Sequence, residues 1–157
     1  MIKIKKYQIL EHKADLKIKA FGKNREELFL NMFLGMNESL KPVIGKTEEK
    51  IRTPRFSREP CFPRRARKIK REIQIKSLDL PVLLVDFLSE VLYLIQVNRE
   101  IYNDIKFKKL TKTELEAEIF GQKVERFGED IKAVTYHALD VYQRKDRDWE
   151  ATVLFDI

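Results

Sequence analysis

The longest apolar region of the chain, residues 78–97, constrains the fold more than any other feature. It carries Asp79 near its start and Pro81 in the turn that follows, where a helix tolerates proline. Two further carboxylates, Asp86 and Glu90, interrupt the run and argue against a membrane span. Because the segment is apolar on nearly every side, it predicts a helix from about residue 79 to 97 that packs flat against a sheet.

Around this helix, runs of alternating apolar and polar residues predict β-strands. We expect strands at residues 2–10, 15–21 and 67–76, around 105–107 and 115–119, and at 131–142 and 148–156. An earlier helix is expected to begin at Asn24, which forms a capping pair with Glu27, and to end before Pro42. This order predicts an α+β domain: a largely antiparallel sheet of about six to seven strands with two helices packed on it.

The length and the cysteine content bound the class of protein. The 157 residues suit a single domain, with a basic Pro- and Arg-rich loop at about 45–68. Cys61 is the one cysteine, which excludes an internal disulfide and fits a reducing compartment, so we expect a cytoplasmic location. The first ten residues alternate instead of forming an apolar block, so no signal peptide is expected.

The net charge of +7 is concentrated in residues 52–71, which hold nine basic residues and one acidic residue. The remainder of the chain therefore carries a net charge of −1, so an argument for polyanion binding rests on this segment. One hypothesis is an RNA-binding module in which the segment contacts phosphates and its two phenylalanines stack on bases. The candidate contacts to a polyanion are Arg64, Arg65, Arg67 and Lys68.

The sequence contains none of the common catalytic motifs. There is no G-x-S-x-G nucleophile motif, no G-x-x-x-x-G-K phosphate loop, no C-x-x-C pair and no H-E-x-x-H zinc motif. Cys61 lies in the basic loop, which would lower the pKa of a thiol, but no base partner is evident beside it. We therefore do not expect a catalytic cysteine.

Carboxylates near the two ends of the chain form a candidate cation site. Asp15 stands at the start of an expected strand, and Asp156 follows an alternating run that ends at Phe155. Ile157, the last residue, would add the terminal carboxylate, and such oxygen ligands suit Ca²⁺, Mg²⁺ or Mn²⁺. Taken alone, Asp15 fits a solvated or turn-capping carboxylate better, and spacing in the sequence does not join the two ends.

Lys132 and His137 lie in the run IKAVTYHALDVY near the C-terminus. As a regular strand, this run would put Lys132 and Tyr136 on one face and His137 on the other. Taken alone, Lys132 fits a solvated strand lysine, and His137 fits a structural histidine among apolar neighbours better than a ligand.

Four blocks of the sequence resemble the archease family, in the same order and over most of the chain. They are EHKADLKIKAFGKNREELF, LPVLLVDFLSEVLYL, IKAVTYHALDV and WEATVLFDI. Archeases are small cytoplasmic α+β proteins that act as cofactors of the RtcB-type tRNA-splicing RNA ligase, promoting its guanylylation and multiple turnover. The resemblance implies a non-catalytic activator of that ligase, with RNA contacted indirectly through the ligase, no membrane partner and no small-molecule substrate of its own.

The resemblance also implies roles for particular residues. The metal-binding aspartate of the family matches Asp15, the terminal pair matches Asp156 and Ile157, and the lysine important for ligase activation matches Lys132. The implied cofactor is a divalent metal ion: Ca²⁺, Mg²⁺ or Mn²⁺. Possible supporting residues are Glu11, His12 and His137.

The chain departs from the family pattern in two ways. Glu11 and Lys13 stand where the family usually has Asp and Thr, and the first of these changes keeps the carboxylate. The segment at 52–71 is longer and more basic than the usual connection, which leaves its role open.

Overall fold

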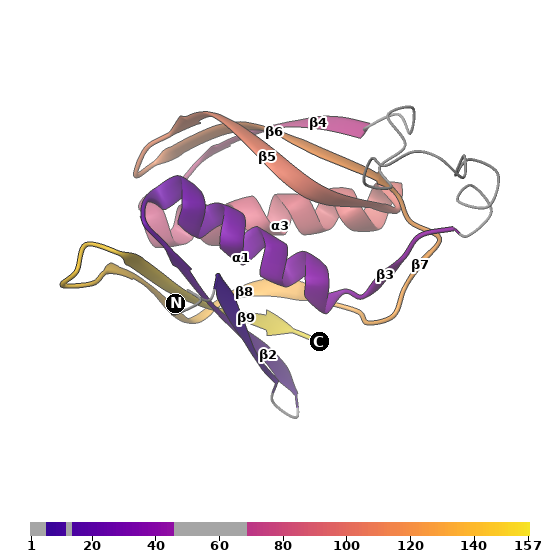
Figure 1. Cartoon of the computed structure of the whole chain (residues 1–157), viewed down its shortest axis with the longest axis horizontal. Helices are drawn as coiled ribbons and strands as arrows, with labels where there is room; N and C mark the ends of the chain where they lie inside the picture. Colours follow the sequence, from indigo (N-terminus) through magenta and orange to yellow (C-terminus); the bar gives the residue numbers. More distant parts are fainter. Residues whose placement is uncertain (1–5, 12–13, 46–68) are drawn as a thin grey trace, which may run out of the picture.

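A computed structural model describes residues 6–11, 14–45 and 69–157, with two helices lying between two antiparallel sheets (Figure 1). The four-stranded sheet has the order β1 (Tyr7–Glu11), β2 (Asp15–Gly22), β9 (Trp149–Asp156), β8 (Ala133–Gln143). The three-stranded sheet has the order β4 (Ile69–Lys76), β6 (Glu114–Lys123), β5 (Glu100–Leu110). A short ladder joins β3 (Pro42–Val43) to β7 (Arg126–Phe127).

The α+β class and the two helices are therefore confirmed. The strands form two main sheets, and each helix contacts both of them. Helix α1 lies against β2 and β5, and helix α3 lies against β8 and β4. The sequence did not predict the short ladder of β3 and β7. The predicted basic loop falls, beyond Gly45, outside the described residues.

Helix α1 (Arg25–Ser39) begins as its capping pair predicts. The side chain of Asn24 accepts a hydrogen bond from the backbone N–H of Glu27 at 2.8 Å. This bond satisfies one of the four N–H groups that have no partner at the start of a helix. The apolar residues Leu28, Phe29, Met32, Phe33 and Met36 of α1 are buried.

Helix α3 (Leu80–Asn98) is the predicted central helix. Asp79 caps it by accepting from the N–H of Val82 at 3.0 Å, and Pro81 lies in the first turn. The helix is long and apolar enough to cross a membrane, but a buried core helix passes the same test, and nine of its residues are buried here. It ends at Arg99, whose φ of 52° is left-handed.

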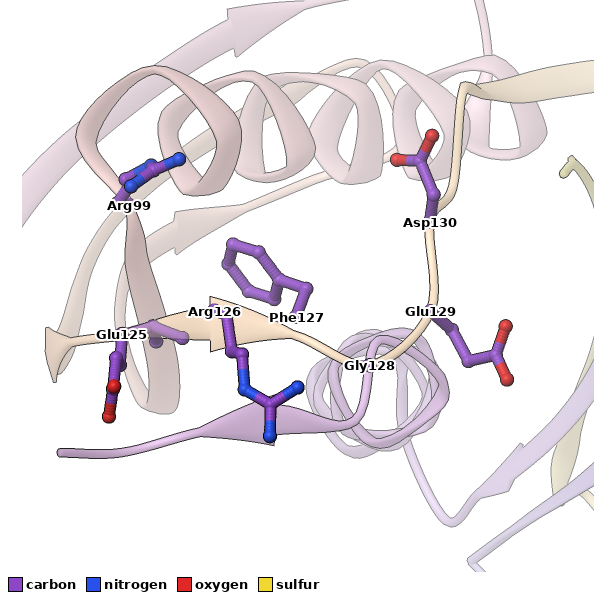
Figure 2. A pocket seen from close by; sticks show the side chains of 8 residues that line it. Arg99, Glu125, Arg126, Phe127, Gly128, Glu129 and Asp130 are labelled. Atoms are coloured by element: carbon purple, nitrogen blue, oxygen red, sulfur yellow. The ribbon is translucent and has the colours of Figure 1, made fainter. Parts of the chain in front are cut away.

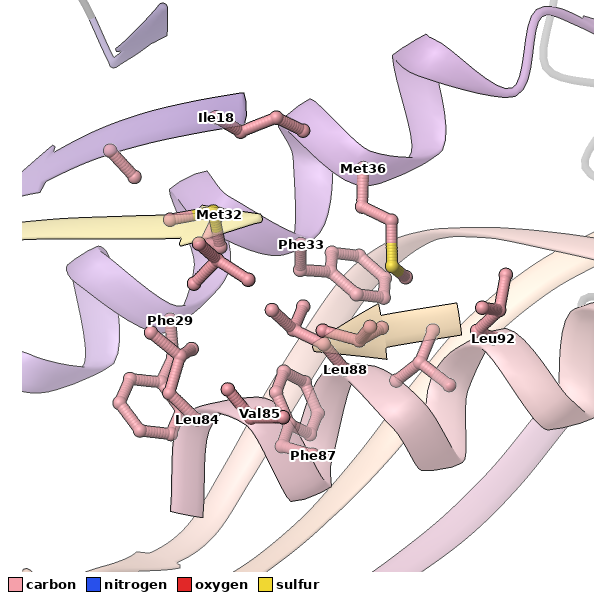
Figure 3. Packing of buried hydrophobic residues seen from close by; sticks show 14 of the residues in the cluster. Ile18, Phe29, Met32, Phe33, Met36, Leu84, Val85, Phe87, Leu88 and Leu92 are labelled. Atoms are coloured by element: carbon pink, nitrogen blue, oxygen red, sulfur yellow. The ribbon is translucent and has the colours of Figure 1, made fainter. Parts of the chain in front are cut away.

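The two helices meet in the core, where aromatic rings fill the space between them (Figure 3). The ring of Phe87 on α3 lies 5.9 Å from the ring of Phe29 and 6.2 Å from the ring of Phe33, both on α1. All three rings are fully buried. Burial of apolar area of this kind is the main favourable term in folding, and it fixes both sheets relative to the helices.

Strand β8 is less regular than its sequence predicts. Thr135 pairs with Leu154 and Asp140 pairs with Thr152, so residues 136–139 stand opposite Val153 alone. Ala138 takes a left-handed φ of 53° inside this bulge. The predicted alternation of faces from Lys132 to Leu139 is therefore wrong beyond Thr135, because the bulge resets the period.

Candidate functional site

The two ends of the chain meet at one corner of the four-stranded sheet. In the antiparallel pairing of β2 with β9, Asp15 lies directly opposite Asp156. Residues paired in this way project from the same face of a sheet, with Cβ atoms about 5 Å apart. Leu16 and Phe155 are buried on the inner face, so the two carboxylates belong to the outer face.

The segment that carries Lys132 reaches the same corner from the other side. Ala133 of β8 pairs with Asp156, and the backbone N–H of Lys132 donates to the carbonyl oxygen of Asp156 at 2.7 Å. The side chain of Lys132 is exposed. Three stretches that are far apart in the sequence therefore converge, at Asp15, Lys132 and Asp156.

The chain end is held by its neighbours on both sides. β9 lies between β2 and β8, and its pairing continues through Asp156 on each of them. Ile157 follows at once and is 40% exposed. A strand paired on two sides keeps its last paired residue in a defined position, so the backbone of Asp156 is fixed beside that of Asp15.

The corner offers hard oxygen donors that fit a divalent cation. Asp15 is half-buried and Asp156 is exposed, and neither forms an ion pair within the part of the chain that the structure describes. Within that same part, no group of three or more His, Cys, Asp or Glu side chains is close enough to hold a metal. The described side chains at this corner therefore supply two carboxylates, those of Asp15 and Asp156.

The other predicted site residues lie away from this corner or outside the residues that the structure describes. The backbone of Glu11 pairs with Leu16, while His12 is outside the described residues. His137 is exposed in the β8 bulge, so the interpretation as a histidine packed among apolar neighbours is wrong. The candidate polyanion contacts also lie outside the described residues: Arg64, Arg65, Arg67 and Lys68.

A buried charge cluster was missed by the sequence analysis. Glu100, at the start of β5, is only 1% exposed and accepts two hydrogen bonds from Arg71, at 2.7 and 3.1 Å. The hydroxyl of Tyr102 also donates to it, and the ammonium of Lys123 lies 3.5 Å away. The sequence itself shows only a glutamate two residues before a tyrosine, at Glu100 and Tyr102.

These contacts explain the protonation state of Glu100. Burial acts to raise the pKa of its carboxyl, but hydrogen bonds from Arg71 and Tyr102 outweigh burial and hold the pKa below its ordinary value. Burial and the adjacent carboxylate raise the pKa of the Tyr102 hydroxyl. Glu100 is therefore an ionised carboxylate in the folded protein at neutral pH.

A hollow of about 440 Å³ opens between the end of α3 and the segment that leads to Lys132 (Figure 2). The half-buried ring of Phe127 lies at its centre. The Gln96 side chain donates to the carbonyl oxygen of Ile131 at 2.8 Å, which ties this segment to α3. The residues that line the hollow are Arg99, Val124, Glu125, Arg126, Phe127, Gly128, Glu129 and Asp130.

The fold and this corner define a class: a small α+β domain whose C-terminal strand brings carboxylates from both chain ends together. The chain belongs to the archease family, whose model, described as the archease protein family, matches residues 7–157. It is 35% identical to protein archease of Methanosarcina barkeri over 161 residues, covering 98% of this chain and 97% of that protein. It is 27% identical to protein archease of Pyrococcus abyssi, covering 98% and 100%.

Two solved structures share the fold. The solution structure of Methanobacterium thermoautotrophicum protein 1598 matches with a TM-score of 0.64 and 23% identity, covering 98% of this chain and 100% of that one. The crystal structure of an archease, described as a possible chaperone, from Thermotoga maritima matches with a TM-score of 0.61 and 20% identity, covering 94% of each chain.

Proposed function

We propose that this protein is a non-catalytic activator of an RtcB-type RNA ligase, and that it promotes guanylylation and repeated turnover of the ligase with a bound divalent metal. Membership of the archease family supports this function. The observation that carries the proposal is the register of β2 with β9, in which Asp15 is opposite Asp156 next to the chain end. The proposed setting is the cytoplasm.

In this proposal the metal ligands are Asp15, Asp156 and the terminal carboxylate of Ile157. A divalent cation, when bound, would offset negative charge on the triphosphate that the ligase uses. The chain's own contribution is to hold the ligands: pairing on both sides of β9 orients Asp156 and the terminus without further folding on binding. Glu11, His12 and His137 stay candidates for supporting roles.

Lys132 is the proposed activating side chain. Its backbone is fixed by the bond to Asp156, while its ammonium is exposed and free to reach a partner. A lysine beside the metal ligands would present a second positive charge to the same phosphates. In this proposal neither group acts as a nucleophile, which agrees with the lack of catalytic motifs in the sequence.

The test is a single-turnover labelling assay of ligase guanylylation, with and without the protein. We expect the protein to accelerate labelling and Lys132→Ala to lose most of the stimulation while folding normally, because the side chain is exposed. Lys145→Ala is the matched control, since Lys145 is exposed in the β8–β9 turn. Equal labelling rates with and without the parent protein would remove the proposal, and full stimulation by Lys132→Ala would remove the role of that lysine.

A further inference from the structure

Three cationic residues lie around the C-terminal end of α3. Two of them come from strands and the third is the C-cap of the helix itself. They are Arg71 of β4, Arg99 at the end of α3, and Lys123 of β6; we call them the α3-end patch. The ammonium of Lys123 donates to the carbonyl oxygen of Asn98 at 3.0 Å. The backbone N–H of Val124, the next residue, donates to the carbonyl oxygen of Arg99 at 2.9 Å. These bonds fix β6 against the helix end.

Positive charge exceeds negative charge within the patch. Arg71 and Lys123 share one carboxylate, that of Glu100, which is almost fully buried beneath them. Their own side chains are 38% and 69% exposed. Arg99 forms no ion pair within the described part of the chain. Three cations against one carboxylate leave a net charge of about +2 among these four residues.

Arg99 occupies a backbone position that normally favours glycine. Its φ of 52° is in the left-handed region, which glycine adopts without the steric penalty of a Cβ. The sequence keeps a long cationic side chain there instead. Figure 2 shows this side chain directed toward the hollow, beside the ring of Phe127.

We propose that the α3-end patch binds the phosphates of single-stranded RNA. Arginine and lysine side chains spread over two strands and a helix end can contact successive phosphates, which supply sequence-independent affinity. The adjacent Phe127 ring offers a surface on which a base of a flexible single strand can stack. Glu129 and Asp130, at the opposite end of the hollow, limit the contact to the end near Arg99, where Glu125 is the one carboxylate that lines the hollow (Figure 2).

The position of the patch strengthens the choice of a polyanion. In the sequence, Arg71 ends the basic run 52–71, and the fold brings Arg99 and Lys123 near Arg71 from distant parts of the chain. Residues 128–130 line the hollow beside the patch, and Lys132 follows two residues later in the sequence. Direct RNA contact goes beyond ligase activation, and it can be tested without any ligase, so the two proposals can fail separately.

The test is fluorescence anisotropy of a labelled oligouridine titrated with the full chain at several salt concentrations. The variants are Arg99→Gly and Lys123→Gln, singly and together. The matched controls are Arg147→Gly and Lys145→Gln, in the turn between β8 and β9 at the far end of the molecule (Figure 1). Arg147 is also left-handed, with a φ of 72°, so both arginine variants remove one charge and place glycine in the same conformation.

We expect the slope of log affinity against log salt to fall by about 0.7 for each patch cation removed, the value for single strands. The controls should keep the slope of the parent protein. Arg99→Gly should raise the melting temperature, so weaker binding by that variant cannot come from unfolding. No binding of oligouridine by the parent, unchanged slopes in the patch variants, or equal losses in the controls would each overturn the proposal. Patch variants that bind oligouridine normally but bind the ligase weakly would assign the patch to an acidic protein surface instead.

Discussion

The outer faces of the two sheets differ in whether lysines accompany their carboxylates. On the three-stranded sheet, lysines lie next to the carboxylates: Glu118 lies 2.8 Å from Lys108 and 3.5 Å from Lys70. Glu114 of β6 likewise forms ion pairs with Lys76 of β4 and Lys109 of β5, the two strands that flank β6. At the corner of the four-stranded sheet, by contrast, two carboxylates face each other directly.

This difference separates a structural surface from a candidate site. Opposite charges in register across a sheet stabilise it slightly, whereas like charges in register destabilise it. The three-stranded sheet also holds one like-charged pair in register, Glu72 opposite Glu118, but the ammonium of Lys108 lies 3.8 Å from the first carboxylate and 2.8 Å from the second. The pair of Asp15 and Asp156 has no such cation within the described part of the chain, although the sequence holds 32 lysines and arginines. A cation bound between them would remove the repulsion.

The largest expected effect on stability comes from removing the buried carboxylate of Glu100 in the three-stranded sheet. Glu100→Ala leaves Arg71 and Tyr102 without their shared acceptor, and we expect it to lower the free energy of unfolding by about 3 kcal/mol. Urea denaturation measures this. Glu72→Ala is the control, because its carboxylate lies 3.8 Å from Lys108 and is 69% exposed, so little change is expected. Similar losses in both variants would show that burial does not set the strength of these pairs.

The dependence of stability on pH should also show the contribution of the Glu100 carboxylate. The pKa of Glu100 is lower in the folded protein than in the unfolded chain, so its contribution is fully present above the unfolded value of about 4.3. The contribution is lost as the pH falls through the folded value. Denaturation measured from pH 6 to 2 should therefore show a steeper loss of stability in the parent than in Glu100→Ala. Parallel curves would mean that Glu100 is not held ionised by its partners.

The sequence predicted local structure well and long-range pairing poorly. Asn24 and Asp79 mark the starts of the two helices. They can be recognised in the sequence because each cap bonds to a residue only three positions further on. The opposition of Asp15 and Asp156 depends on sheet order, and resemblance to a family supplied it before any register was known. The β8 bulge has no glycine or proline to mark it, and Ala138 takes the left-handed conformation instead.

The missed cluster shows the same limit. Arg71 and Glu100 lie 29 positions apart and meet only because β6 holds β4 and β5 on its two sides. Alternation places a residue on a face of its strand, but it does not say which residue stands on the next strand. A buried charge pair of this kind therefore leaves almost no trace in a single sequence.

The metal ligands are tested by moving one of them. One residue added after Ile157 keeps every side chain but displaces the terminal carboxylate, and loss of a ligand should weaken divalent metal binding by at least about tenfold. Asp15→Ala and Asp156→Ala should act in the same direction. Ile157→Val is the control, since it preserves the chain length and its carboxylate.

Calorimetric titration with Ca²⁺, Mg²⁺ and Mn²⁺ measures these affinities. Equal affinities in the parent and in all the ligand variants would identify the corner groups as ordinary surface carboxylates. A loss in the extended chain alone would leave the terminus as a ligand and exclude the aspartates.

The smallest expected effect is on the stability of the metal-free protein. Asp15→Asn keeps the size of the side chain and removes one of two opposed charges, so we expect the free energy of unfolding to rise by about 0.5 kcal/mol in the presence of a chelator. The gain should shrink at high salt, which screens the repulsion in the parent. Asp140→Asn is the matched control, because Asp140 is exposed on the same sheet opposite Thr152 and has no like charge across from it. Excess Ca²⁺ should reverse the order of the two proteins, because only the parent keeps both carboxylates. A variant that is no more stable than the parent without metal would show that the two carboxylates do not repel, and the contrast between the sheets would then lose its energetic basis.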